Sequence, residues 1–307
     1  MKDFDPAALE CLAALADDGN FERAAQRLSI TQSAVSQRLR SLEAQVGQLL
    51  VVRSRPLRLS EPGKVLLRFA RQLQAMRADV ARELGVDANA GQRLPIAVNA
   101  DSLATWVMPA LDALVNEGLS LELVVDDQSF THDWLRQGAV LGCVSTVKEA
   151  LRGCQVLPLG VMRYIAVASP RFIREALPQG LNRTNFALVP FLSFNRKDDM
   201  QLQWAARAFG VRQPRLQERF VPSSEAYVRA ALMGWGIGIV PELQVRGLLE
   251  NGTLVPVLPD IGIALRLFWH QWRLGPDGAA PSERVALLDR IGAALVAGAK
   301  AALDKPN

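Results

Sequence analysis

Side chains that can read DNA gather on one side of a helix predicted over residues 32–46. On a wheel of about 100° per residue they lie opposite the apolar positions of the same helix. Gln, Ser and Arg hydrogen-bond to base edges or hold phosphate oxygens, and recognition helices place their N-terminal residues in the major groove. This side of the helix therefore has the chemistry of a DNA-reading surface. Its side chains are Ser33, Ser36, Gln37, Arg40 and Ser41, and Gln32 stands beside them at the exposed first turn.

Positive charge is concentrated in the same part of the chain. Between Gly19 and Ser60 there are seven arginines and two acidic residues, although the net charge of the whole chain is only +4. Such a local cationic surface suits the phosphate backbone of DNA. After the helix, a basic turn around Pro56 separates an apolar run from an alternating one, which predicts a β-wing. The further residues that we expect at the DNA are Thr31, Arg38, Arg53, Arg55, Pro56 and Arg58.

Three helices are predicted to position this surface. Pro6 can occupy the first turn of the first helix, and Gly19-Asn20 ends it. Asn20 can cap a second helix over 21–28, and Thr31 can cap the third. A plain three-helix packing unit would share these caps and this apolar periodicity, so the polar side and the local charge favour the DNA-binding alternative. The inward positions of the third helix are Val35, Leu39, Leu42 and Val46.

A longer helix follows and is predicted to pair with a second copy of the chain. Its apolar residues recur in steps of three and four, the spacing of a coiled-coil seam, while its other faces are polar. The alternative is that this stripe packs on the chain's own C-terminal part. The helix fades into a small, polar run over 85–91, which predicts a hinge. The residues of the seam are Leu66, Phe69, Leu73, Met76 and Val80.

From Leu94 onward, short β-rich runs alternate with helical patterns, which is typical of an α/β module. The runs over 161–169 and 258–266 would carry the chain from one lobe to another and back. Strands are predicted over 94–98, 119–125, 140–144, 164–168, 186–191, 236–240 and 265–269. Helices are predicted over 102–117, 225–233, 242–250 and 281–303.

Polar residues stand where these strands end and where helices begin. Ligands of α/β modules bind at the C-terminal ends of strands, where free backbone N–H groups attract anions. Carboxylates at such positions can face a cationic group. The alternatives are simple helix capping for the hydroxyl and amide groups and surface solvation for the charges. The candidate ligand contacts are Asn99, Asp101, Ser102, Thr105, Ser145, Asp198, Ser224 and Glu225.

One long pattern joins the second helix, the third helix and the wing. It runs Phe21-x-x-Ala24-Ala25-x-x-Leu28-x-Ile30-Thr31-Gln32-Ser33-Ala34-Val35-Ser36-x-x-Leu39-x-x-Leu42-Glu43-x-x-x-Gly47, followed by Leu50 and Arg53. This pattern resembles the DNA-binding signature of LysR-type transcriptional regulators. The resemblance implies an α/β multidomain chain: a winged helix-turn-helix over 1–60, a linker dimerisation helix with a hinge over 61–90, and a two-lobed effector domain similar to periplasmic binding proteins over 91–307. Lobe one would span 91–162 and 267–307, and lobe two 163–266.

Three segments of the C-terminal module, over 99–106, 198–200 and 224–228, resemble the lysine- and arginine-responsive branch of that family. The resemblance implies a small-molecule effector, lysine or arginine, and control of genes for basic amino-acid export or metabolism. A different small metabolite, sensed by the same architecture, is the alternative. Asp198 is our first choice to face a cationic side chain. The resemblance also implies a double-stranded DNA operator of approximate two-fold symmetry, a homodimer or homotetramer, and contact with RNA polymerase.

Several other classes of protein are disfavoured. The start of the chain lacks the apolar core of a signal peptide, so we expect a cytoplasmic protein without a membrane partner rather than a transport solute-binding protein. Neither His132 nor His270 has a catalytic partner nearby in the sequence, and Gly234-Trp-Gly236-Ile-Gly238 lacks the lysine of a phosphate loop. We therefore expect no enzyme, no cofactor and no metal.

A thiol-based redox sensor is the remaining rival. Cys143 and Cys154 would be its candidate pair. Their neighbours in the sequence are chiefly apolar, which indicates buried and inert thiols. The sequence therefore favours a ligand sensor over a redox sensor.

Overall fold

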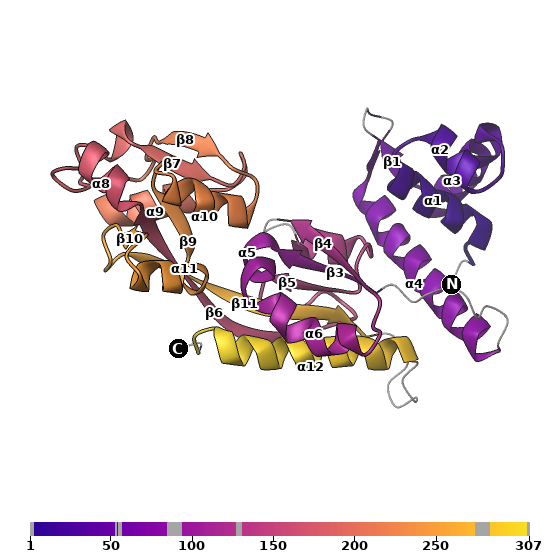
Figure 1. Ribbon diagram of the computed structural model, residues 1–307. Coiled ribbons are helices and arrows are strands. Elements are labelled where there is room, and N and C mark those ends of the chain that lie inside the picture. The colour runs from indigo at the N-terminus through magenta and orange to yellow at the C-terminus, as the bar shows by residue number, and fades with distance from the viewer. Residues whose placement is uncertain are drawn as a thin grey trace.

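The computed structural model describes residues 3–52, 54, 57–84, 94–126, 131–273 and 283–305. Figure 1 shows an N-terminal helical unit, one long helix packed on it, and a two-lobed α/β module. The predicted hinge over 85–91 lies outside the described residues. So do three of the predicted DNA contacts, which are Arg53, Arg55 and Pro56.

The N-terminal unit has the three predicted helices and is closed by a two-stranded wing. The side chain of Asn20 accepts a 2.8 Å hydrogen bond from the N–H of Arg23, and Thr31 accepts one of 3.2 Å from the N–H of Ala34. Gly47 takes a left-handed φ of 77° and ends the third helix. The predicted bounds of that helix are confirmed. The elements are α1 (Pro6–Asp18), α2 (Phe21–Arg27), α3 (Gln32–Val46), β1 (Val51–Val52) and β2 (Arg58–Leu59).

The long helix α4 (Glu61–Glu83) packs on α1 and shares the hydrophobic core of the helix-turn-helix. Leu66 and Leu67 of α4 are buried there. At Gly63 a Cβ would collide with the carbonyl oxygen of Leu50, so glycine is needed for the helix to start this close to the wing. The helix-turn-helix and α4 therefore form one body, which we call the DNA-binding unit.

A mixed seven-stranded sheet runs through the C-terminal module. Its strands are β3 (Leu94–Asn99), β4 (Leu121–Asp126), β5 (Gly142–Ser145), β6 (Cys154–Ala168), β9 (Gly238–Pro241), β10 (Val255–Pro256) and β11 (Gly262–Trp272). The order is β10-β6-β11-β5-β3-β4, with β9 also paired to β6. Because β3 and β4 are parallel, their last residues, Asn99 and Asp126, lie side by side at one edge of the sheet.

The two long strands β6 and β11 connect the lobes. They pair antiparallel from Gly262 opposite Ile165 to Trp272 opposite Cys154. The two segments predicted to carry the chain between the lobes, 161–169 and 258–266, overlap β6 and β11, although β6 already begins at Cys154. A bend or shear of this one ribbon would therefore change how lobe one stands relative to lobe two.

Helices cover both lobes, and α12 runs beneath lobe one along β6, β11 and α6 (Figure 1). The helices of lobe one are α5 (Ala100–Ser102), the π-helical turn η1 (Leu103–Val107), α6 (Met108–Asn116), α7 (Thr131–Arg136) and α12 (Glu283–Ala302). Lobe two has α8 (Pro170–Ala176), the 3-10 turn η2 (Phe186–Leu188), β7 (Pro190–Ser193), α9 (Met200–Phe209), β8 (Gln217–Phe220), α10 (Ser224–Leu232) and α11 (Glu242–Glu250). No helix in the described ranges is long and apolar enough to cross a bilayer.

Two predictions from the sequence are wrong in part. The strand predicted over 186–191 begins with the turn η2, and the extended segment is β7. Phe186 stacks on Phe209 with 4.7 Å between the ring centroids, so this apolar run fills the core without being extended. The helix predicted over 102–117 is interrupted by the π-helical turn η1.

Candidate DNA-reading surface and effector cavity

The polar side of α3 is turned to solvent. Val35, Leu39 and Leu42 are buried against the other helices of the unit, which fixes the rotation of α3 about its axis. Ser36 is half-buried. The exposed residues of this side are Thr31, Gln32, Ser33, Gln37 and Arg40. The side chains that the sequence assigns to base reading thus lie together on one accessible face of a rigid helix.

Two further predicted DNA contacts take different positions. Arg58 is exposed on β2 of the wing. Arg38 is half-buried, and its Nη1 lies 4.0 Å from the sulfur of Cys11 on α1. The Arg38 side chain is therefore directed partly towards the helical core and away from the polar side of α3.

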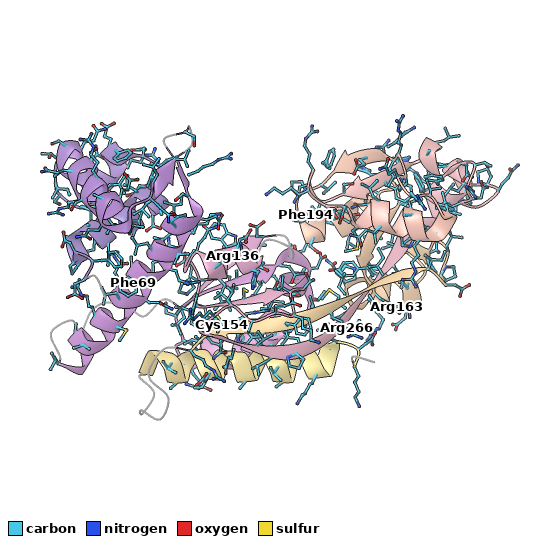
Figure 2. All side chains as sticks on the ribbon, turned by 180° about the vertical axis from the view of Figure 1, so that it is seen from behind. Phe69, Arg136, Cys154, Arg163, Phe194 and Arg266 are labelled. Atoms are coloured by element: carbon cyan, nitrogen blue, oxygen red, sulfur yellow. The ribbon has the colours of Figure 1, made fainter. Side chains whose placement is uncertain are left out.

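A cavity that is partly open to solvent lies between the lobes, where β3 and β4 of lobe one end opposite α9 and α10 of lobe two. Three carboxylates line it, and no basic side chain is found among its described lining residues. Phe194, labelled in Figure 2, belongs to the part of lobe two that faces lobe one. The polar lining residues are Asn99, Asp101, Asp126, Tyr164, Asp198, Ser224, Tyr227 and Gln244. The wall of the cavity is therefore anionic.

Asp101 connects the two lobes through its carboxylate. The hydroxyl of Ser224 in lobe two donates a 2.7 Å hydrogen bond to Oδ1 of Asp101. The hydroxyl of Tyr164, on the connecting strand β6, donates one of 2.9 Å to Oδ2. Ser224 Oγ also lies 3.2 Å from Oε1 of Gln244. Hydrogen bonds to an ionised acceptor are the stronger kind, so these donors hold the carboxylate in one orientation.

Asn99 places an unpartnered amide in the wall of the cavity. The residue is only 2% exposed, and neither its Oδ1 nor its Nδ2 has a hydrogen-bond partner among the residues that the structure describes. A buried polar group left without a partner costs roughly 1–3 kcal/mol. This amide is therefore available to a ligand that reaches the cavity and offers both an acceptor and a donor.

Asp126 extends the anionic wall at the end of β4. Its Oδ2 accepts a 2.8 Å hydrogen bond from Nε1 of Trp134 on α7. Asp126 was not predicted from the sequence, although it ends β4 beside the end of β3, where Asn99 stands. That position at the end of the neighbouring parallel strand is the signal that could have found it. The other polar lining residues missed were Tyr164, Tyr227 and Gln244.

Asp198 lines the cavity but also holds its own segment together. Its oxygens accept hydrogen bonds of 2.8 Å from the N–H of Phe194, 3.1 Å from the N–H of Met200 and 2.7 Å from Nε2 of Gln201. The carboxylate therefore fixes the entry to α9. A cation in the cavity would have to share it with these three donors.

Tyr227 is a neutral donor beneath the cavity. Its hydroxyl donates a 2.6 Å hydrogen bond to the carbonyl oxygen of Leu192 and accepts one of 3.3 Å from the N–H of Ile239. Burial raises the pKa of the Tyr227 hydroxyl well above its usual value. The phenol therefore stays protonated and joins α10 to β7 and β9.

Four of the predicted ligand contacts are not among the residues that line this cavity. Thr105 donates a 2.7 Å hydrogen bond to the carbonyl oxygen of Asp101. Ser145 is fully buried and accepts a 3.2 Å hydrogen bond from the N–H of Val147. Ser102 is fully buried, whereas Glu225 is exposed on α10. The structure thus brings Asn99, Asp101, Asp198 and Ser224 together and leaves these four outside.

The two candidate redox thiols are separated by a strand. Cys143 on β5 pairs with His270 of β11, and Cys154 on β6 pairs with Trp272 on the other side of β11. Two strands that flank a third are about 10 Å apart, whereas a disulfide needs Cα atoms within roughly 4.4–6.8 Å. Burial also raises the pKa of Cys143 strongly and that of Cys154 to about 12. This geometry disfavours a redox pair, and the described residues contain no group of three His, Cys, Asp or Glu able to hold a metal.

Both parts of the chain match models of one family. Residues 6–64 match the model described as bacterial regulatory helix-turn-helix protein, lysR family, and residues 88–280 match the LysR substrate binding domain. The chain therefore belongs to the LysR family and is a DNA-binding transcription regulator.

Known members of this family resemble the chain over most of its length. It is 42% identical over 276 residues to the HTH-type transcriptional regulator ArgP of Aeromonas salmonicida, which covers 89% of this chain and 92% of that protein. It is 40% identical over 273 residues to the regulator LysG of Mycobacterium tuberculosis, which covers 88% of each. Both relatives are named transcriptional regulators.

Solved structures agree with this assignment. The crystal structure of ArgP from Mycobacterium tuberculosis is similar with a TM-score of 0.81 at 36% identity, covering 99% of this chain and 100% of that one. Full-length LysG from Corynebacterium glutamicum, solved with bound effector Arg, is similar with a TM-score of 0.74 at 34% identity, covering 98% and 100%. The two-lobed effector domain of this chain thus has the fold of LysR regulators.

Proposed function

We propose that this regulator senses lysine or arginine in the cavity between its lobes and controls genes of basic amino-acid export or metabolism. The observation that carries the proposal is the charge of the cavity wall, which holds Asp101, Asp126 and Asp198 and no basic side chain among its described residues. An anionic wall favours a ligand with more positive groups than negative ones. The bound effector Arg in the similar LysG structure supports the same class of ligand.

Each group of a basic amino acid has a counterpart in this wall. The cationic side chain and the α-ammonium group would lie against the three carboxylates, because charge-assisted hydrogen bonds are the strong ones in such a site. The α-carboxylate would accept a hydrogen bond from the unpartnered amide of Asn99. Tyr164 and Ser224 would keep Asp101 oriented for the cation.

The ligand would act by favouring one arrangement of the lobes. Asp101 and Asp126 belong to lobe one, whereas Asp198 and Ser224 belong to lobe two. A ligand that bridges the two sets binds the closed arrangement better than an open one, and this difference in affinity is the free energy available to shift the equilibrium. The shift would re-space the helix-turn-helix units and change DNA bending and contact with RNA polymerase.

The exposed apolar side of α4 supports a homodimer, or a tetramer built from two dimers. Of the predicted seam, Leu66 is buried in the DNA-binding unit, and Leu73 packs against the same core. Phe69, Met76 and Val80 are 45%, 56% and 54% exposed. A stripe of large apolar side chains left in water favours pairing with a second copy. Such a dimer would present two copies of α3 to an operator of approximate two-fold symmetry.

Thermal unfolding of the full-length protein tests the choice of ligand. A ligand that binds only the folded state at a hundred times its Kd stabilises that state by about 2.7 kcal/mol. We expect lysine or arginine to raise Tm by several degrees, and we expect leucine and glutamate at the same concentration to leave it unchanged. A rise with leucine or glutamate alone would replace the proposal with a different metabolite for the same cavity. No rise with any of the four would remove the ligand assignment.

A further inference from the structure

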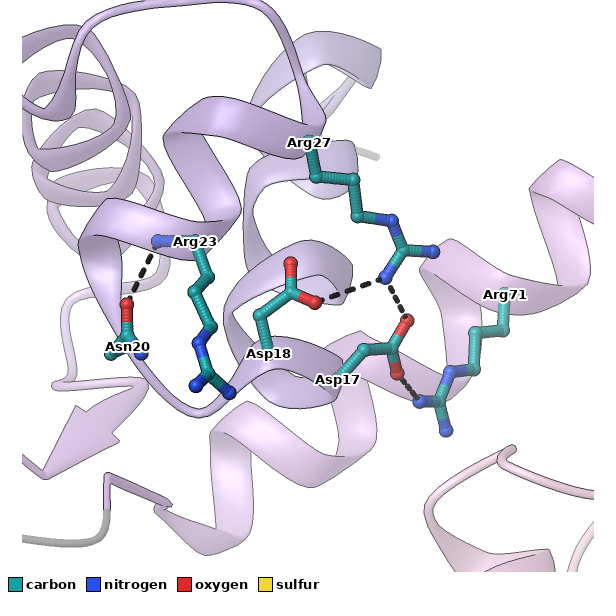
Figure 3. Close-up of polar contacts among 6 residues, drawn as sticks. All are labelled: Asp17, Asp18, Asn20, Arg23, Arg27 and Arg71. Atoms are coloured by element: carbon teal, nitrogen blue, oxygen red, sulfur yellow. Dashed lines mark hydrogen bonds and ion pairs between the residues drawn. The ribbon is translucent and has the colours of Figure 1, made fainter.

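Arg71 of α4 contacts both the DNA-binding unit and lobe one. Its guanidinium forms an ion pair with Asp17 at the end of α1, and its Nη1 donates a 3.2 Å hydrogen bond to the carbonyl oxygen of Gln137. Asp17 uses its second oxygen to bind Arg27 of α2 at 3.1 Å (Figure 3). We name the contacts of Arg71 with Asp17 and Gln137 the Arg71 junction. One side chain, only 21% exposed, thus ties α1, α4 and lobe one together.

The fit of α4 on lobe one extends beyond this hydrogen bond. Gln137 follows the last residue of α7, so its carbonyl lies at the negative end of that helix, where a guanidinium is favoured. At the next position, Gly138, a Cβ would come within 3.0 Å of the Cα of Arg68, which shows how closely α4 approaches. The guanidinium carbon of Arg68 lies 5.5 Å from the ring centroid of Trp272, a cation–π contact.

This contact between α4 and lobe one is polar and small. Leu66, Leu67 and Ala70 of α4 are buried in the core of the DNA-binding unit, and the core of the effector domain is a separate cluster. Among the described residues, no apolar side chain of α4 joins that second core. A hydrogen bond contributes about 1 kcal/mol and a cation–π contact with a buried ring about 2 kcal/mol, so such a contact can open and re-form without unfolding either core.

The same helix α7 also reaches the effector cavity. Trp134 of α7 donates its 2.8 Å hydrogen bond to the carboxylate of Asp126, which lines the cavity. Gln137, which accepts from Arg71, lies three residues after Trp134, about one helical turn. A cation that engages Asp126 competes with the Trp134 N–H for that carboxylate. A displacement of Trp134 would therefore be passed, within one helical turn, to Gln137 in the Arg71 junction.

We propose that Arg71 is a positioning residue: it holds the DNA-binding unit on lobe one, and a ligand at Asp126 shifts the strength of that hold through α7. The holding role stands on the contacts of Arg71 alone, whereas the transmission role rests on the proposed function. The two parts are tested by separate measurements, so that failure of one is distinguishable from failure of the other.

A distance measurement without ligand tests the holding role. Spin labels on cysteines introduced at Glu22 of α2 and Asp112 of α6, both exposed, report the separation of the DNA-binding unit from lobe one in the full-length dimer. Cys154 is replaced by Ser, and labelled protein is diluted with unlabelled protein so that distances within one chain dominate. We expect a narrow distribution for the parent protein and a broadened or shifted one for Arg71→Met. An unchanged distribution for Arg71→Met overturns the proposal.

Two matched variants separate this role from general loosening. Glu10→Gln removes the 3.6 Å ion pair between Glu10 and Arg77, which also joins α1 to α4 but does not reach lobe one. It should leave the distribution as in the parent, and equal broadening by both variants would overturn the special role of Arg71. Arg71→Lys keeps the charge and should restore part of the narrow distribution.

The transmission role is tested by the ratio of operator affinities with and without arginine. Effectors typically change such affinities by roughly 5- to 150-fold. We expect the ratio for Arg71→Met to fall to within about two-fold of one, while calorimetry shows that the variant still binds arginine. A wild-type ratio retained by Arg71→Met overturns transmission through Arg71. A wild-type protein whose operator affinity ignores arginine overturns the proposed function, and the distance measurement then decides the holding role alone.

Discussion

The hydroxyl of Ser224 in lobe two donates a hydrogen bond to the carboxylate of Asp101 in lobe one, with 2.7 Å between the oxygens. Tyr164 holds the second oxygen of the same carboxylate at 2.9 Å. The carboxylate of Asp101 in lobe one is held by a donor from lobe two and by a donor from the connecting strand. Its hydrogen bonds therefore depend on the orientation of the two lobes relative to each other. This relationship underlies the first prediction.

Ser224→Ala should weaken arginine binding by roughly ten-fold, because a hydrogen bond to a charged group contributes about 1.5–3 kcal/mol and this one is partly exposed to solvent. Isothermal titration measures the change. The neighbouring Glu225→Gln is the control, since Glu225 is exposed and does not line the cavity. If Glu225→Gln weakened arginine binding and Ser224→Ala did not, the result would contradict this site and would support the prediction from sequence that Glu225 contacts the ligand.

Asp198→Asn should reduce both stability and ligand affinity. An amide nitrogen would replace one carboxylate oxygen that now accepts from the N–H of Phe194, the N–H of Met200 or Nε2 of Gln201. Leaving one of these donors unsatisfied should lower the free energy of unfolding by about 1–3 kcal/mol, as measured by urea denaturation. Asp199→Asn, whose carboxylate accepts only from Gln203 among the contacts identified, should change it little. Wild-type stability for Asp198→Asn would show that the carboxylate does not hold the entry to α9.

Substitutions on α3 and on the wing should impair DNA binding in different ways. Arg40→Ala should reduce discrimination between the operator and random DNA, since a base-reading contact is worth about 1–3 kcal/mol. Arg58→Ala should lower affinity for both and reduce the slope of log affinity against log salt by about one, the effect of one lost phosphate contact. Fluorescence anisotropy over a salt series measures both. Equal losses on operator and random DNA for Arg40→Ala would contradict the assignment of α3 to base reading.

Stability should fall below neutral pH through a buried histidine pair. The rings of His132 and His270 meet edge to face with 5.1 Å between their centroids, and within the described part of the chain Nε2 of His132 and Nδ1 of His270 have no hydrogen-bond partner. Burial lowers the pKa of both rings, and His270 lowers that of His132 further. The unfolded chain therefore takes up protons first as the pH falls through about 6.5, and stability is lost from there down to the folded pKa values.

The pH dependence can be assigned to these rings by one substitution. His132→Phe keeps an aromatic ring at this position and removes one of the two titrating groups. We expect the loss in free energy of unfolding between pH 7.5 and pH 5.5 to be smaller in the variant than in the wild type. The nearby carboxylates of Asp133 and Glu149 are the same in both proteins, so the comparison isolates the contribution of the histidine pair. Equal losses would contradict the assignment.

The DNA-binding unit could be predicted almost residue by residue, because its signals are local. Caps at Asn20 and Thr31, a glycine at the end of α3 and a helical apolar period all act within a few residues of one another. The turn η2 was mistaken for a strand because an apolar run buried by distant residues carries no period of its own. There the contact with Phe209 decides the conformation.

Half of the polar residues that line the effector cavity could be predicted, because their signals are also local. Asn99, Asp101, Asp198 and Ser224 could be named from strand ends and helix starts. Asp126 required the knowledge that β4 lies beside β3. The three hydrogen bonds that Asp198 accepts, and the sharing of Asp101 between the lobes, depend on how segments far apart in the sequence meet. No pattern within one segment encodes that meeting.

Calorimetric titration with arginine, on the wild-type protein and on Asp101→Asn, tests the central claim most directly. The unliganded Tm of the variant establishes that it is folded, and glutamate serves as the oppositely charged control ligand. The cavity predicts that the wild type binds arginine and not glutamate, and that the variant binds arginine at least about ten-fold more weakly. Equal arginine affinity of the two proteins, or binding of glutamate in preference to arginine, would contradict it.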